Sequence, residues 1–256
     1  MGLRGKDVRR PGPRRTGTPG PGPRAPGALS RLPEVYDVTF NGFGGHPVKG
    51  RLTIPARTTT PLPVVVQFIG YGGGRGLPHM HLLWPAAGRA HFVMDTRGQG
   101  ARMAGGDTPD PVGSAPSYPG FMTRGIESPH DYYYRRVFTD AVRAVEAARS
   151  RPAAPTASPM AIAVHRTRAT QVHETLSYFD GVHFAARAKA PALFSTALED
   201  QVAPPSTVFA AFNAWSHPDK QINVYGFNAH EGGGPHQEAA ALRRLTAGPA
   251  GRGRVC

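Results

Sequence analysis

Apolar residues from position 34 onward alternate in ways that are typical of strands. Two strand-like segments, 35–40 and 48–54, flank the turn-rich residues 41–45, and this arrangement predicts a hairpin. Residues 63–69 and 91–95 are continuous apolar runs of strand length, as expected for buried strands of a parallel sheet. Further strands are predicted at 191–197 and 221–225.

Helical spacing occurs between these strands. Apolar residues from Tyr134 to Ala148 recur every three or four positions and predict an amphipathic helix over 131–149. Residues 104–130 are rich in Gly, Pro, Ser and Asp and predict a long loop. Shorter helices are expected at 77–88, 166–176, 181–189, 205–215 and 237–245. Strands that alternate with helices predict an α/β fold with parallel pairing.

Charge is concentrated at the ends of the 256 residues. The formal net charge is +13, of which residues 1–31 carry +7 and the last fourteen residues +4, so residues 32–242 carry only +2. Residues 1–33 are rich in Arg, Pro and Gly and are expected to be a disordered tail. We expect one domain over 34–246 and a flexible tail over 247–256. The basic tail has no aromatic residue for base stacking, so a solvated tail or an over-extended start is favoured over nucleic-acid binding.

Several classes of protein are excluded by simple counts. No apolar segment has the features of a secretory signal or approaches the ~20 residues of a membrane span. The single Cys256 excludes an internal disulfide framework and metal-thiolate chemistry, and the histidines show no metal-ligand spacing. We therefore expect no metal, no cofactor, no nucleic-acid partner, no membrane association and a cytoplasmic location.

Two residues have the order and setting of a catalytic acid and base. Asp200 follows the predicted strand 191–197, and His230 lies on a Gly-rich segment after the strand 221–225. In α/β-hydrolases the acid and then the histidine follow the nucleophile, each on a loop after a strand. The nucleophile is expected on a Gly-x-Ser-x-Gly turn, and the sequence contains no such turn.

Several longer segments carry a family resemblance. They are Gly70–Gly74, Asp95–Gly100, Gly106–Thr108, Phe121–Gly125, Tyr132–Arg135, Leu176–Asp180 and His230–Gly233. Together they resemble the acetyl xylan esterase and cephalosporin C deacetylase family of α/β-hydrolases. That family has three signatures: Arg-Gly-Gln, Gly-x-Ser-Gln-Gly and His-Glu. This chain has the first at 97–99 and the third at 230–231, and the second is absent.

The resemblance implies an α/β-hydrolase-like sheet that is internally truncated. Where relatives have the central strand and the serine elbow, this chain has the short connector Pro152–Pro159. The earlier strands are then expected either to pair with the strand around Leu193 or to expose unsatisfied edges, in a marginal or aggregation-prone protein. Ser114, Ser117, Ser158 and Ser195 lack the setting of a nucleophile, so none is assigned.

The resemblance also implies roles for the residues that remain. His230 would be the general base and then the general acid. Asp200 would keep the imidazole of His230 in the tautomer that this role requires. The amide of Tyr71 would be one oxyanion donor, while Arg97 and Gln99 would brace the loops around the pocket. The partner would be a small acetylated sugar or cephalosporin-type ester, and relatives form hexamers, which suggests a homo-oligomer.

Three hypotheses follow for the function of the chain. The first is an acetyl esterase of this family that is inactive because the nucleophile is missing. The second is a non-catalytic binding protein that keeps the pocket loops. The third is a gene-model remnant with no selected function.

Overall fold

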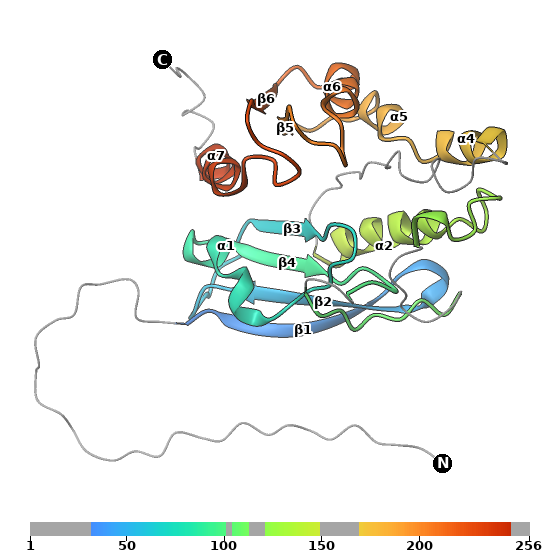
Figure 1. The fold of residues 1–256 in the computed structure, drawn as a ribbon. Coiled ribbons are helices and arrows are strands. Elements are labelled where there is room, and N and C mark those ends of the chain that lie inside the picture. The colour runs from blue at the N-terminus through green and yellow to red at the C-terminus, as the bar shows by residue number, and fades with distance from the viewer. Residues whose placement is uncertain (1–31, 101–103, 113–120, 149–168, 247–256) are drawn as a thin grey trace, which may run out of the picture. The chain divides into compact units, whose positions relative to one another are not determined.

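A computed structural model describes residues 32–100, 104–112, 121–148 and 169–246 (Figure 1). The predicted tails therefore lie outside the described residues except for positions 32 and 33. The connector Pro152–Pro159 also lies outside them.

The chain begins with the predicted hairpin. Strand β1 (Glu34–Asn41) pairs antiparallel with β2 (Pro47–Ile54), and Glu34 lies opposite Ile54. A 3-10 turn, η1 (Phe43–Gly45), joins them, and its Gly44 and Gly45 have φ angles of 62° and 77°. Glycine tolerates this left-handed region, so the turn closes without strain. The hairpin prediction is confirmed.

Two further strands complete a four-stranded mixed sheet. Strand β4 (Ala90–Met94) pairs antiparallel with β2 and parallel with β3 (Val64–Phe68), which gives the order β1-β2-β4-β3 (Figure 1). Every residue of β4 is buried, as its apolar sequence predicts. No residue of β3 is fully buried, because in the described residues this strand has a neighbour on one side only. The prediction of a buried strand at 63–69 is wrong in that respect.

A second sheet contains the two remaining strands. Strand β5 (Ala192–Ala197) pairs parallel with β6 (Lys220–Tyr225), and Ala197 lies opposite Tyr225. Without the central strand, the earlier strands were expected either to pair with the strand around Leu193 or to have an open edge. The described residues show an open edge. Strand β3 bonds only β4, and β5 bonds only β6. The β3 strand does not pair with the strand around Leu193.

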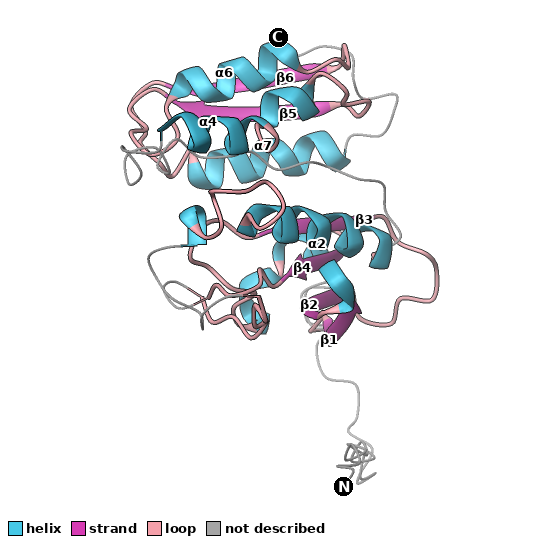
Figure 2. Cartoon of the chain, turned by 90° about the vertical axis from the view of Figure 1, so that its right-hand side faces the viewer, coloured by secondary structure: helices cyan, strands magenta, loops and turns pink. Residues whose placement is uncertain are grey.

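The helices follow the predicted order along the chain, and Figure 2 shows them in cyan beside the magenta strands. The predicted helix 77–88 is two short pieces, η2 (Pro78–His81) and α1 (Leu83–Ala86). Pro85 has no N–H to donate to the carbonyl of His81, which prevents one continuous helix. The remaining helical elements are η3 (Phe121–Thr123), α2 (Tyr133–Ala147), α4 (Ala169–Ser177), α5 (Gly181–Ala185), α6 (Pro205–Ala214) and α7 (Gly234–Thr246).

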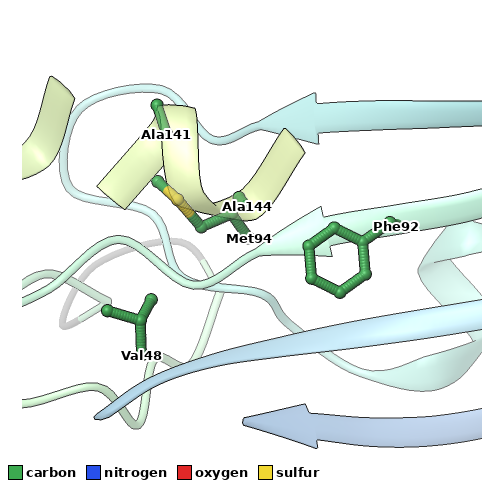
Figure 3. Close-up of a cluster of buried hydrophobic side chains, with 5 residues drawn as sticks. All are labelled: Val48, Phe92, Met94, Ala141 and Ala144. Carbon is green, nitrogen blue, oxygen red and sulfur yellow. The ribbon is translucent and has the colours of Figure 1, made fainter. Parts of the chain in front are cut away.

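The main apolar core lies between helix α2 and one face of the four-stranded sheet (Figure 3). Ala141 and Ala144 of α2 pack with Phe92 and Met94 of β4 and with Val48 of β2. Small helix residues allow the helix to approach the strands closely, and burial of these side chains stabilises the domain by about 25 cal/mol per Å² of apolar surface. None of the helices in the described ranges is long and apolar enough to cross a membrane.

Candidate functional site

The loop after β5 holds Asp200 in a fixed position. Its Oδ1 atom accepts hydrogen bonds from the backbone N–H groups of Val202, at 2.8 Å, and Ala203, at 2.9 Å. Its side chain is 9% exposed. Burial acts to raise the pKa of Asp200, but the hydrogen bonds from Ala203, His230 and Val202 outweigh it and lower the pKa. Asp200 is therefore an ionised carboxylate at neutral pH.

The loop after β6 places His230 against this carboxylate. The Nδ1 atom of His230 lies 3.2 Å from Oδ1 and 3.1 Å from Oδ2 of Asp200. Two backbone hydrogen bonds join the loops, from Leu198 N–H to the carbonyl of Tyr225 at 3.0 Å and from Glu199 N–H to that of Asn228 at 3.2 Å. The parallel register of β5 and β6 therefore brings the predicted acid and histidine together.

Glu231 shapes the turn that carries His230. Its carboxylate accepts hydrogen bonds from the side-chain amide of Asn228, at 2.7 Å, and from the backbone N–H of Ala229, at 3.2 Å. The bond from Asn228 is the main cause that lowers the pKa of Glu231. Sequence reasoning gave Glu231 no role, although the Asn-x-x-Glu spacing was visible.

The His230 ring is largely exposed to solvent. The His230 side chain is 63% exposed, and its hydrogen-bond partner among the described residues is Asp200. No serine hydroxyl of the described ranges contacts the ring. Ser195 is half-buried within β5, and Ser114, Ser117 and Ser158 lie outside the described residues.

The Gly-rich loop after β3 is fixed by Gln99. The Gln99 side chain accepts a hydrogen bond from Gly72 N–H at 2.7 Å and donates one to the hydroxyl of Tyr133 at 2.9 Å. The ring of Tyr71 packs on Phe121, with ring centroids 4.8 Å apart. Gln99 is 5% exposed, so these are the contacts of a bracing residue.

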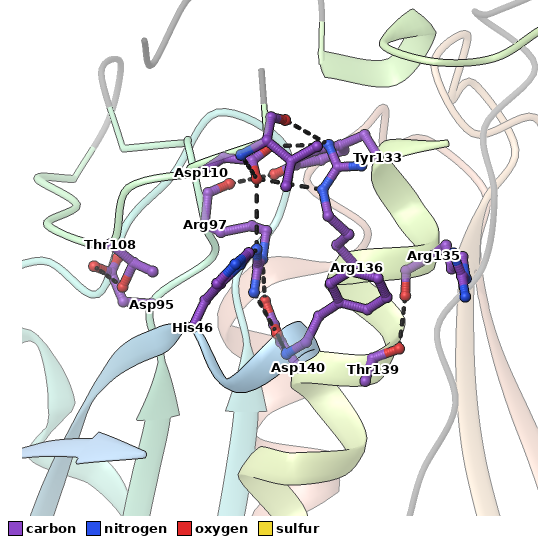
Figure 4. A network of polar contacts seen from close by, with 12 residues as sticks. His46, Asp95, Arg97, Thr108, Asp110, Tyr133, Arg135, Arg136, Thr139 and Asp140 are labelled. Carbon is purple, nitrogen blue, oxygen red and sulfur yellow. Dashed lines mark hydrogen bonds and ion pairs between the residues drawn. The ribbon is translucent and has the colours of Figure 1, made fainter. Parts of the chain in front are cut away.

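Arg97 lies at the centre of a buried ionic network (Figure 4). It donates two hydrogen bonds to Asp140 of α2, at 2.5 Å and 2.8 Å, and one to Asp110 at 3.4 Å. All three side chains are inaccessible to solvent. The guanidinium of Arg97 also lies 3.3 Å from Nδ1 of His46. Arg97 therefore holds the loop after β4 against α2.

Asp110 is the second acid of this network. It accepts hydrogen bonds from Arg136 at 3.0 Å and from Arg124 at 3.2 Å. Burial acts to raise the pKa of Asp110, but the bonds and charges of Arg136, Arg97 and Arg124 outweigh it and lower the pKa. Asp110, Arg136 and Asp140 were not predicted as important residues.

The predicted site residues fall into two groups that share no hydrogen bond. Neither Asp200 nor His230 is bonded to Tyr71, Arg97 or Gln99 in the described part of the chain. Within the same ranges, no group of three or more His, Cys, Asp or Glu side chains is placed to hold a metal ion.

Comparison with known proteins agrees with this arrangement. The family described as acetyl xylan esterase matches residues 28–157 and 160–247. The chain belongs to this acetyl xylan esterase family. A structure of an acetyl xylan esterase from Paenibacillus sp. R4 is similar, with a TM-score of 0.73 and 32% identity over 85% of this chain and 84% of that one.

A structure of acetyl xylan esterase 1 from Thermoanaerobacterium sp. JW/SL YS485 has the same fold. Its TM-score is 0.70 at 23% identity, over 85% of each chain. The α/β fold with a mixed sheet is thereby confirmed, and the family is one of carboxylic-ester hydrolases.

Proposed function

We propose that this chain has the framework of an esterase that deacetylates xylo-oligosaccharides or cephalosporin-type esters, and that it does not complete the serine reaction itself. The observation that supports this proposal is the pairing of His230 with Asp200 when no serine of the described ranges is in contact with the ring. The sequence also contains no Gly-x-Ser-x-Gly turn. The acid and the base are present, and the group that they would activate is missing.

In the full reaction, each remaining residue would have a defined task. His230 Nε2 would take the proton of a serine hydroxyl as the hydroxyl oxygen attacks the acetyl carbonyl, and would then return the proton to the leaving alcohol. Asp200 would keep the Nδ1 proton in place and stabilise the imidazolium. The backbone N–H of Tyr71 would donate to the developing oxyanion.

Loss of the serine removes most of the rate. In a comparable triad, removal of the nucleophile alone costs about 10⁶-fold in turnover, and the residual rate comes from binding and the oxyanion hole. The other oxyanion donor would come from the residue after the serine and is also missing. We therefore expect no measurable deacetylation of sugars.

Two measurements test the proposal. Purified protein is incubated with acetylated xylo-oligosaccharides and the released acetate is measured, with the Paenibacillus sp. R4 enzyme as positive control. A fluorophosphonate probe then reports any activated serine. We expect no acetate and no labelling. Acetate release together with a labelled serine would contradict the proposal.

A binding protein is the second candidate. Phe227 is 94% exposed and Leu198 is 51% exposed, and both lie on the loops that carry the acid and the histidine. Exposed apolar side chains beside a retained acid–histidine pair favour binding without turnover. Calorimetric titration with an acetylated xylo-oligosaccharide at two well-separated temperatures tests this candidate, and an absence of heat at both would contradict it.

Assembly and location also belong to the proposal. A homo-oligomer is proposed from the family resemblance, and sedimentation velocity will measure it. A cytoplasmic location is proposed because the single cysteine requires no oxidising compartment. Fractionation of the producing cells tests the location.

A further inference from the structure

The imidazole of His230 has Nδ1 held by Asp200, and Nε2 has no hydrogen-bond partner within the described residues. We propose that His230 itself accepts acyl groups from activated esters, such as aryl acetates, so that the chain is a slow esterase that needs no serine. This inference rests on the proposed function, because a serine within reach of Nε2 would receive the acyl group first. It differs from the family mechanism in the atom that forms the covalent bond.

The first support is the fixed tautomer of the ring. Nδ1 lies 3.1 Å and 3.2 Å from the two carboxylate oxygens of Asp200. Asp200 is nearly buried and is itself held by two backbone N–H groups, so its charge stays in place. A carboxylate accepts hydrogen bonds only, so Nδ1 carries the proton and the lone pair of the neutral ring is on Nε2.

The second support is the access to Nε2. The His230 side chain is 63% exposed, and within the described ranges Nε2 has no hydrogen-bond partner that would occupy its lone pair. Phe227 lies three residues earlier in the sequence on the same loop, and its side chain is 94% exposed. Nε2 is therefore both nucleophilic and reachable.

The chemistry balances without any further cofactor. The Nε2 lone pair forms a bond to the acyl carbon, and the bond from that carbon to the aryl oxygen breaks, so that the aryl oxide leaves with the electron pair. Asp200 offsets the positive charge on the acylated ring. Water then attacks the acyl carbon, the carbon–nitrogen bond breaks, its electron pair returns to Nε2, and acetate is released with two protons, one of which the aryl oxide can take up.

The same chemistry predicts that sugar acetates are stable toward this chain. A sugar alkoxide is a poor leaving group unless an acid protonates it, whereas an aryl oxide leaves unaided. The inference therefore predicts turnover of aryl acetates together with the absence of sugar deacetylation.

The experiment uses p-nitrophenyl acetate and the full chain. We expect the rate of H230A to fall at least about ten-fold, which corresponds to 1.4 kcal/mol of activation free energy. D200N is expected to lose rate as well, by about three- to ten-fold, because a neutral amide accepts a weaker hydrogen bond than a carboxylate. H79A and H236A are the matched controls, since both histidines are exposed and neither forms an ion pair with a carboxylate of the described ranges; their rates should equal that of the unchanged chain.

Further readouts distinguish acyl transfer to His230 from base catalysis by His230 and from attack by a serine. The solvent deuterium isotope effect should be close to unity, because Nε2 attacks the ester without a proton transfer, and mass spectrometry of the protein should find no acetyl group on a serine. An unchanged rate in H230A would overturn the inference. A rate lost in H230A with a large isotope effect would also overturn it, because His230 would then act as a base on water. Acetyl on a serine, with release of acetate from sugars, would instead overturn the proposed function.

Discussion

Arg97 and Asp140 are joined by two hydrogen bonds, from Nε to Oδ2 at 2.5 Å and from Nη2 to Oδ1 at 2.8 Å, and neither side chain is exposed to solvent. Burial of the guanidinium acts to lower the pKa of Arg97, but the bonds and charges of Asp140 and Asp110 outweigh it and raise the pKa. Each charge has lost its hydration and depends on the other. The pair therefore fixes the loop after β4 on helix α2.

Removal of the acid from this pair should be costly. Asp140→Ala leaves Arg97 buried without its main partner, and we expect the free energy of unfolding to fall by about 3–5 kcal/mol. Urea unfolding measures it. Glu146→Ala on the same helix is the control, because Glu146 pairs with Arg143 at the exposed surface and should contribute only about 0–1 kcal/mol. Equal losses in the two variants would contradict this view of the network.

The network also predicts a loss of stability in acid. The pKa of Asp110 in the folded chain is below the ordinary 3.8, so its stabilising effect is complete above the unfolded-state pKa. The effect is lost as the pH falls through the folded-state pKa, so the free energy of unfolding should decline below about pH 4. Urea unfolding over a pH series measures it. Asp110→Asn should be less stable at neutral pH and should show a smaller decline, and an identical decline would argue against Asp110 as a source.

The loop after β6 requires glycine at one of its positions. Gly233 has a φ angle of 83°, and a Cβ atom there would lie 2.4 Å from the ring of Tyr225. We expect Gly233→Ala to destabilise the chain by about 2 kcal/mol through backbone strain and displacement of the ring. Gly226→Ala on the same loop is the matched control, because no atom lies within 4 Å of its added Cβ. Thermal unfolding compares them, and a smaller effect at Gly233 would refute this account.

A second glycine is required where the loops after β3 and β4 meet. A Cβ on Gly74 would lie 2.3 Å from the backbone of Gly106, and the N–H of Gly74 bonds the carbonyl of Ala104 at 2.8 Å. Gly74→Ala should therefore lower the free energy of unfolding by about 1–3 kcal/mol. Gly105→Ala is the control, with open space around its Cβ. Chemical denaturation of both variants checks the difference, which should vanish if the two loops are not packed closely.

The elements of the fold were largely predictable because they depend on local periodicity. The alternation over 35–54 predicts the hairpin, and the helical spacing after Tyr134 predicts α2. Burial of β3 was not predictable in the same way. An apolar run indicates that a strand is suited to a buried position. Whether the strand is in fact buried depends on which elements pack beside it, and these come from other parts of the chain.

The acid and the histidine of the site were predictable from their order and from the strands before them, and the structure brings them into contact. The buried network was not. Arg136 and Asp140 are charged residues on the buried face of α2. The spacing of apolar residues predicts the helix but does not indicate that these two charged residues are buried. Their partner Asp110 lies on an irregular segment with no repeating pattern, so only the folded chain shows the connection.

The contact between Asp200 and His230 depends on a short contiguous stretch. The β5–β6 ladder and the two backbone bonds between its loops all lie within residues 192–230. No residue upstream of this stretch takes part in these hydrogen bonds, so they do not require the segment that would carry the nucleophile. An acid–imidazole contact is therefore not by itself a sign of catalytic competence, which has to be judged from the nucleophile.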